Sequence, residues 1–92
     1  MNYRLIRVCK GEAMSAIPQT VVRYDLKASA VALAQDGYEV DDKEVMIVAR
    51  RSGLEITLYV NGRLMMAPMD DKESAKRTAD SFYSLLIQAS EE

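Results

Sequence analysis

Apolar and polar residues alternate on both sides of Asn61-Gly62, and this alternation predicts a β-hairpin. Asn and Gly both tolerate the positive φ that a type I′ turn requires at its two central residues. We therefore expect a two-residue turn at this point, with Tyr59 facing Leu64 across the hairpin.

The expected register divides the hairpin into two faces, because successive strand residues point to opposite sides. The predicted core face carries Leu54, Ile56, Leu58, Val60, Met65 and Ala67. The opposite face is more apolar than a solvated face usually is, and it is the main functional clue in the chain. Its predicted side chains are Glu55, Thr57, Tyr59, Leu64 and Met66.

A helix is predicted after the hairpin, because apolar residues recur there at helical spacing. Asp70 and Glu73 form a start similar to a capping box, and acidic residues stabilise a helix N-terminus. The predicted apolar stripe consists of Ala75, Ala79, Phe82, Leu86 and Ala89.

Two strands and a short helix are predicted in the N-terminal part. Alternation predicts a strand over residues 2–10, and β-branched residues predict another over residues 20–25, with a connector over residues 11–18. Asp25 is the expected N-cap of a helix that ends near Asp36, and Gly37 is expected to follow it in the left-handed conformation.

The middle of the chain predicts one further strand before the hairpin. Residues 38–40 are expected to be extended, and Asp41-Asp42 to form a turn. A strand over residues 44–51 is expected to return tightly through Ser52-Gly53.

The predicted element order is β-β-α-β-β-β-α within one domain, residues 1–92. Neither helix can bury its apolar side alone, so the economical solution is a two-layer α+β fold. We expect an antiparallel sheet with both helices packed on one face, which leaves the other face open.

Composition excludes several classes of function. The chain has no His and one Cys, Cys9, so imidazole chemistry, an intrachain disulfide and a zinc site are not expected. No glycine-rich phosphate loop, catalytic constellation or cofactor motif is present. No apolar run reaches the roughly 18 residues needed to cross a membrane, and a cytoplasmic location is expected.

From Tyr24 onward the chain resembles one half of the TATA-binding protein, over about residues 24–88. The family's half-repeat is a strand, a helix opening near an Asp-Leu pair, a run of antiparallel strands and a long closing helix. The matching residues are Asp25-Leu26-Lys27, Tyr38-Glu39, the sequence LYVNGRLM over 58–65 and KESAK over 72–76.

The resemblance implies a fold and one mode of binding. The family carries two such halves in one chain, so a saddle made from this chain would require a homodimer. Phenylalanines on the family's open sheet face insert between DNA base steps, and Tyr59 stands where one is expected. The only phenylalanine here is Phe82, on the last predicted helix, and residues 20–25 lack the asparagines of the family's open face.

Two uses of the open face follow. The first is a small non-catalytic binding module that contacts another protein or a second copy through Tyr59, Leu64, Met66 and Thr57, since an open apolar face usually marks an interface. The second is a nucleic-acid-binding homodimer of the TATA-binding type. Its phosphate contacts would come from Arg50, Arg51 and Arg63.

Overall fold

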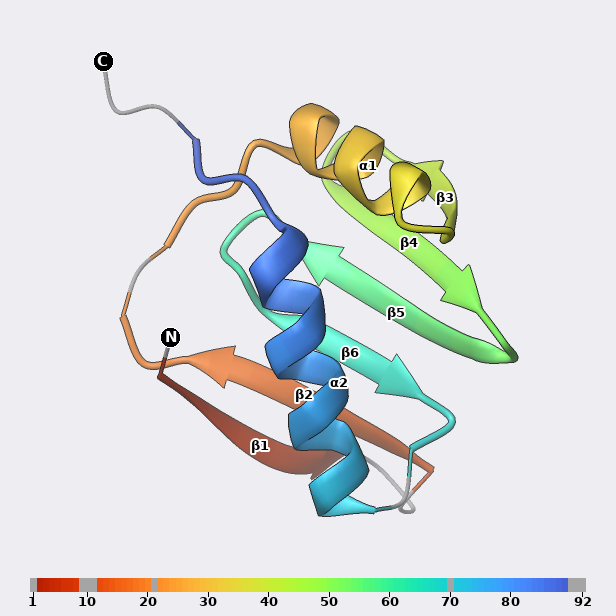
Figure 1. Cartoon of the computed structure of the whole chain (residues 1–92). Coiled ribbons are helices and arrows are strands. Elements are labelled where there is room, and N and C mark those ends of the chain that lie inside the picture. Colours follow the sequence, from red (N-terminus) through yellow and green to blue (C-terminus); the bar gives the residue numbers. More distant parts are fainter. Residues whose placement is uncertain (1, 9–11, 21, 70, 90–92) are drawn as a thin grey trace.

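The computed structural model describes residues 2–8, 12–20, 22–69 and 71–89, and it has two layers (Figure 1). One layer is a six-stranded antiparallel sheet in the order β1-β2-β6-β5-β4-β3. Both helices lie on the same face of this sheet, which confirms the predicted α+β class. The elements are β1 (Tyr3–Val8), β2 (Ala13–Pro18), α1 (Leu26–Gln35), β3 (Glu39–Asp42), β4 (Met46–Arg51), β5 (Leu54–Tyr59), β6 (Leu64–Ala67) and α2 (Lys72–Leu85).

Helix α1 begins and ends as the sequence predicts. The Asp25 carboxylate accepts a hydrogen bond of 3.0 Å from the backbone N–H of Ala28, which satisfies one of the unpaired donors of the first turn. Gly37 follows the helix with a φ of +104°, a conformation that glycine adopts without strain. Leu26 and Leu33 are buried, and the helix packs on β3 and β4.

Helix α2 begins at a different cap from the predicted one. Asp71 is the N-cap, and its carboxylate accepts from the backbone N–H of Ser74 at 3.2 Å and from the Ser74 hydroxyl at 2.7 Å. Asp70 lies outside the described residues. The predicted stripe is buried at Ala75, Ala79 and Phe82, but the helix ends at Leu85, before the last two stripe residues.

Strand β2 corrects the prediction for the N-terminal part. The expected connector over residues 11–18 contains this strand, and among the described residues of 20–25 only a single bridge, Tyr24 to Gln88, is formed. Ala and Ser favour strands weakly, but β2 pairs with both β1 and β6 and buries Met14 and Ala16. Pairing with two neighbouring strands therefore outweighs the weak strand propensity of this segment.

The sheet also has one strand more than predicted. Residues 39–42 form β3 and pair with β4, so the expected turn at Asp41-Asp42 is wrong. The turn comes one step later, where Glu44 has a φ of +72°. The Asp42 carboxylate accepts a hydrogen bond of 2.9 Å from the backbone N–H of Glu44, which satisfies this donor within the tight turn.

The two-residue turn predicted at Asn61-Gly62 is found at Ser52-Gly53 instead. Ser52 and Gly53 form the two-residue turn between β4 and β5, with φ values of +54° and +82° as a type I′ turn requires. The turn at Asn61-Gly62 is three residues long instead. Tyr59 N–H donates to the carbonyl of Arg63 at 2.9 Å and closes a loop of residues 60–62.

Gly62 lies at a crowded junction between the sheet and the second helix. Its φ is +91°, and a β-carbon added there would lie 3.1 Å from Cε2 of Tyr24 and 3.2 Å from Cγ of Pro18. The buried hydroxyl of Tyr83, on α2, donates to the Gly62 carbonyl at 2.6 Å. Burial raises the pKa of Tyr83, so this donor stays protonated.

We expect Gly62→Ala to lower the free energy of unfolding by about 2–4 kcal/mol, because it adds a steric clash to an unfavourable φ. The matched control is Gly53→Ala, which has a similar φ of +82° but nothing within 4 Å of the added β-carbon. The control is expected to cost only about 1–2 kcal/mol. Urea denaturation measures both values, and equal losses would contradict the crowding at Gly62.

A polar cluster joins the edge strand β1 to α2. The hydroxyl of Tyr3 donates to Asp80 at 2.6 Å, and Lys76 donates to the other carboxylate oxygen at 2.9 Å. Both hydrogen bonds hold the pKa of Asp80 below its ordinary value, and the hydrogen bond from Tyr3 has the larger effect. The carboxylate therefore stabilises the fold above its unfolded-state pKa, and this contribution is lost as the pH falls through the folded-state pKa.

We expect Tyr3→Phe to raise the pKa of Asp80 toward its ordinary value, because the strongest hydrogen bond to the carboxylate is removed. Carboxyl ¹³C chemical shifts measured against pH give this value directly. The pKa of Asp71 serves as the control, since it is lowered mainly by Ser74. A pKa of Asp80 that does not move in Tyr3→Phe would show that the Tyr3 contact is absent in solution.

Candidate functional site

The candidate site is the open face, which is the face of the sheet opposite the two helices. Its residues are those that alternate with the buried core positions along each strand. Most of them are apolar or small, and most are partly exposed. The side chains of the open face are Arg4, Ile6, Val8, Ala13, Ser15, Ile17, Met65, Ala67, Glu55, Thr57, Tyr59, Met46, Val48, Arg50, Glu39 and Asp41.

The pairing of β5 with β6 differs by one residue from the predicted register. Thr57 pairs with Met65 and Leu58 with Leu64, because the loop between the strands has three residues rather than two. A one-residue slip moves each side chain of a strand to the other face. The predicted partner-binding residues Leu64 and Met66 are therefore core residues with 0% exposure, and their predicted place on the open face is wrong.

Two of the four predicted partner-binding residues do lie on the open face. Tyr59 and Thr57 are half-buried there, at the positions that the sequence predicts. Met65, which was expected in the core, takes the place assigned to Met66. A role of Tyr59 and Thr57 in partner binding stays a prediction.

A buried serine and an arginine form a polar link inside the open face. Ser15 is 0% exposed, and its hydroxyl donates to the carbonyl of Leu64 at 2.7 Å. Nε of Arg63 donates to the same hydroxyl at 3.1 Å, so the arginine side chain lies over β2. Sequence reasoning missed this pair, since β2 was predicted to be a connector.

The three arginines predicted to contact phosphates do not all lie on one surface. Arg50 is on the open face, where it forms an ion pair of 3.0 Å with Glu55. Arg51 is on the helix side, 4.0 Å from the ring centre of Tyr38 and 3.2 Å from Asp36. Arg63 donates to Ser15 at the far end of the open face. The structure therefore does not bring these guanidinium groups together.

One end of the open face has an apolar hollow of about 480 Å³. Two neighbouring turns supply exposed valines to it, Val45 with 67% exposure and Val60 with 44%. Tyr59 and Met65 line it from the sheet, and Arg63 adds a positive charge. The hollow extends the apolar surface of the open face beyond the strand ends.

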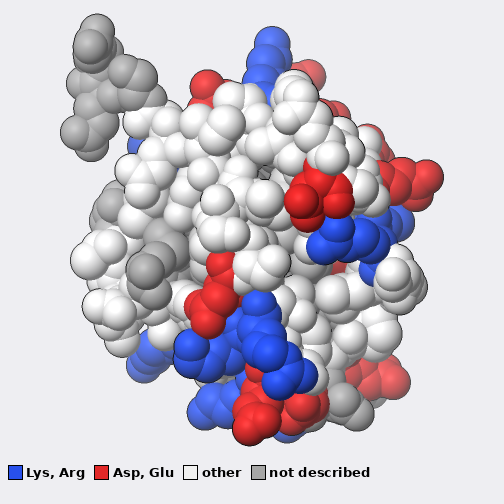
Figure 2. All heavy atoms as spheres, viewed as in Figure 1, with Lys and Arg blue, Asp and Glu red and all other residues white. Residues whose placement is uncertain are grey.

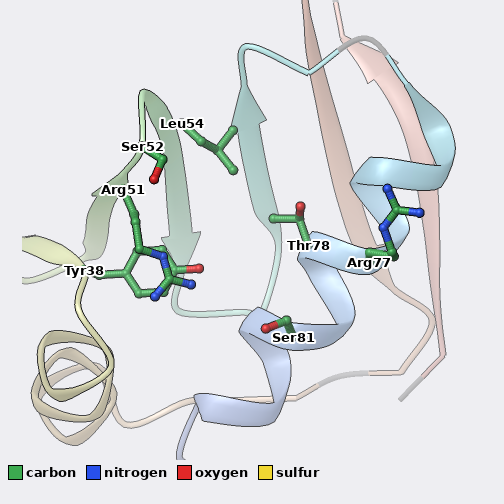
Figure 3. A pocket seen from close by; sticks show the side chains of 7 residues that line it. All are labelled: Tyr38, Arg51, Ser52, Leu54, Arg77, Thr78 and Ser81. Atoms are coloured by element: carbon green, nitrogen blue, oxygen red, sulfur yellow. The ribbon is translucent and has the colours of Figure 1, made fainter.

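A second cavity of about 410 Å³ lies on the helix side, beside α2 (Figure 3). In Figure 3, Thr78 and Ser81 point from α2 into the cavity, with Leu54 near Thr78 and with Arg51 over the ring of Tyr38 on the opposite wall. Arg51 is already paired with Asp36, and Arg77 donates to Ser74 at 3.3 Å. The cavity thus offers the hydroxyl groups of Thr78 and Ser81, while the guanidinium groups of Arg51 and Arg77 already have partners.

Charged side chains are concentrated on the helix side of the molecule. Figure 2 shows basic and acidic groups gathered over the N-terminal half of α2. The exposed residues there are Lys72, Glu73, Lys76, Arg77 and Asp80. On the open face, Arg50 is paired with Glu55 and Asp41 with Lys43, and Arg4 and Glu39 lie on the two edge strands.

Within the described ranges, no group of three or more His, Cys, Asp or Glu side chains converges to hold a metal ion. Cys9 lies outside these ranges. Neither helix of the described part is long and apolar enough to cross a membrane. No protein-family model, curated protein or solved structure matches the chain, so the resemblance to half of the TATA-binding protein stays a prediction.

The observed register makes opposite predictions for two adjacent methionines. Met66→Ala should cost about 2–5 kcal/mol of unfolding free energy, because it leaves a cavity in the core. Met65→Ala should cost less than about 1 kcal/mol, because its side chain is partly exposed on the open face. Urea denaturation measures both free energies of unfolding. A larger loss in Met65→Ala than in Met66→Ala would contradict the observed register and favour the predicted two-residue turn.

Proposed function

We propose that the protein is a non-catalytic binding module whose open face binds another protein or a second copy of the chain. The observation that carries this proposal is the composition of the open face. Five strands present mainly apolar and small side chains there, β3 adds Glu39 and Asp41, and no described element covers this face. Contiguous exposed apolar surface of this kind marks an interaction site.

The distribution of charge supports a protein partner over nucleic acid. A nucleic-acid interface is rich in cations that contact phosphates. On the open face, Arg50 is paired with Glu55, Arg63 donates to a buried hydroxyl, and Arg4 on β1 is offset by the acidic Glu39 and Asp41 on β3. The predicted phosphate contact from Arg51 lies on the other side of the sheet, so an apolar protein surface is the better complement.

Photocrosslinking in cells tests this proposal even while the partner is unidentified. Benzoylphenylalanine is placed at Ile6 on the open face, with 36% exposure, or at Val31 on the outer side of α1, with 58% exposure. We expect protein adducts at position 6 in several-fold higher yield than at position 31, since only position 6 lies in the interface.

The adducts also identify the class of partner. A mass of two chains indicates a second copy, any other protein mass indicates a different partner, and adducts that nuclease removes indicate nucleic acid. Equal yields at both positions, or no protein adduct at position 6, would contradict the proposal.

A further inference from the structure

The apolar hollow at the end of the open face combines exposed apolar walls with a cation at its edge. Val45, before β4, and Val60, after β5, form two of the walls, with 67% and 44% exposure. Tyr59 and Met65 line the hollow from the sheet. An apolar group that binds there would cover both valines and remove their surface from water, which is favourable.

The guanidinium group of Arg63 is held in position by the sheet. Its Nε donates to the Ser15 hydroxyl at 3.1 Å, and this hydroxyl donates in turn to the carbonyl of Leu64 at 2.7 Å. Ser15 is 0% exposed, so its hydroxyl is fixed and sets the direction of the arginine side chain. A ligand of Arg63 therefore avoids most of the entropic cost of ordering a long side chain.

The two terminal nitrogens of Arg63 have no partner among the described residues. None of the ion pairs in the described part of the chain includes Arg63, and its side-chain hydrogen bond there uses Nε. The outer end of the guanidinium group thus retains its four N–H donors. This end has the geometry to bind a carboxylate through two parallel hydrogen bonds.

Asn61 adds a neutral donor beside this cation. Its Oδ1 accepts a hydrogen bond of 3.0 Å from the backbone N–H of Arg63, so the amide NH₂ group is the side that can bind a ligand. None of the described residues that line the hollow is acidic. The hollow therefore presents hydrogen-bond donors and one positive charge within an apolar surface.

One cation within an apolar hollow is complementary to a single carboxylate that is attached to an apolar group. A nucleic-acid backbone carries many phosphates and is bound by several cations together, whereas Arg63 is the one cation in the described lining. The volume of about 480 Å³ is within the range of roughly 300–1,000 Å³ that is usual for small ligand sites.

A chain terminus brings a carboxylate and an apolar side chain together within one residue, because both are attached to the same Cα atom. Arg63 and Met65 are two positions apart along the chain, about 6–7 Å in extended backbone, so one terminal residue can contact both. An aspartate or glutamate in an extended segment points away from the side of its apolar neighbour. The terminal carboxylate is therefore the better complement.

We infer that the apolar hollow binds the C-terminal carboxylate of a partner protein whose last side chain is apolar. Arg63 and Asn61 bind the carboxylate, and Val45, Val60 and Met65 cover the side chain. The inference rests on the proposed function and deepens it, since it states the chemistry by which another protein is recognised at one end of the open face.

A peptide array tests the inference while the partner is unidentified. Decapeptides of random sequence are synthesised in two forms, with a free C-terminal carboxylate or with a C-terminal amide, and are probed with the labelled full chain. We expect the bound peptides to end in an apolar residue and to lose binding as amides. No binding to any peptide, or equal binding to both forms, would overturn the inference.

Variants then test the residues that line the hollow. The strongest array peptide is titrated into the ¹⁵N-labelled chain, and its dissociation constant should rise at least about tenfold in Arg63→Gln, because charge-assisted hydrogen bonds are lost. Val45→Ser should raise it about 3- to 10-fold, because an exposed apolar wall is removed. The amide spectrum of each variant shows whether it is folded.

The matched controls lie on the helix side. Arg77→Gln and Val31→Ser remove an exposed arginine and an exposed valine there, and both variants should bind the peptide as the wild type does. If Arg63→Gln fails to fold, Arg63→Lys replaces it, since lysine keeps the charge but cannot form the two parallel hydrogen bonds. A folded Arg63 variant with wild-type affinity would overturn the inference.

The failure of this inference is distinguishable from the failure of the proposed function. Position 6, on the edge strand β1, is not among the residues that line the hollow. Protein adducts at position 6 without any bound array peptide would leave the proposed function standing and overturn the terminal-carboxylate site alone. Tighter binding of octanoate than of every peptide would assign the hollow to a small amphiphile and would also overturn the inference.

Discussion

The register between β5 and β6 decides the chemistry of both faces of the sheet, and the turn at Gly62 sets that register. A third loop residue shifts β6 by one position, which sends Leu64 and Met66 into the core and Met65 to the open face. The left-handed φ of Gly62 makes this three-residue loop possible without steric strain.

The same turn ties the sheet to the segments that cover it. Pro18 at the end of β2 and Tyr24 before α1 pack close to Gly62, and Tyr83 of α2 donates to its carbonyl. Tyr83 also packs against Tyr3 of the edge strand, with ring centres 5.4 Å apart. The packing of segments that are far apart in the sequence thus depends on Gly62.

Local signals in the sequence were sufficient for the class of fold and for much of its helix geometry. Asp25 and Gly37 bound α1 as expected because capping depends on residues only a few positions apart. The return at Ser52-Gly53 was predicted for the same reason.

Features that depend on distant parts of the chain were not predictable from local pattern. Strand β2 has weak strand propensity and forms because β1 and β6 lie on either side of it. The loop length at Gly62 depends on its packing against Tyr24 and Pro18, which no local pattern reveals. Because the open face inherits this register, two of the four predicted partner residues, Leu64 and Met66, lie in the core instead.

The most direct test of the register, and of the two faces that it defines, is a solvent-accessibility measurement by NMR on methyl-labelled protein with a soluble gadolinium chelate. We expect the chelate to broaden the Met65 methyl signal, because Met65 is partly exposed on the open face, and to leave the signal of the buried Met66 methyl group sharp. Broadening at Met66 with protection at Met65 would contradict both the register and the open face that follows from it.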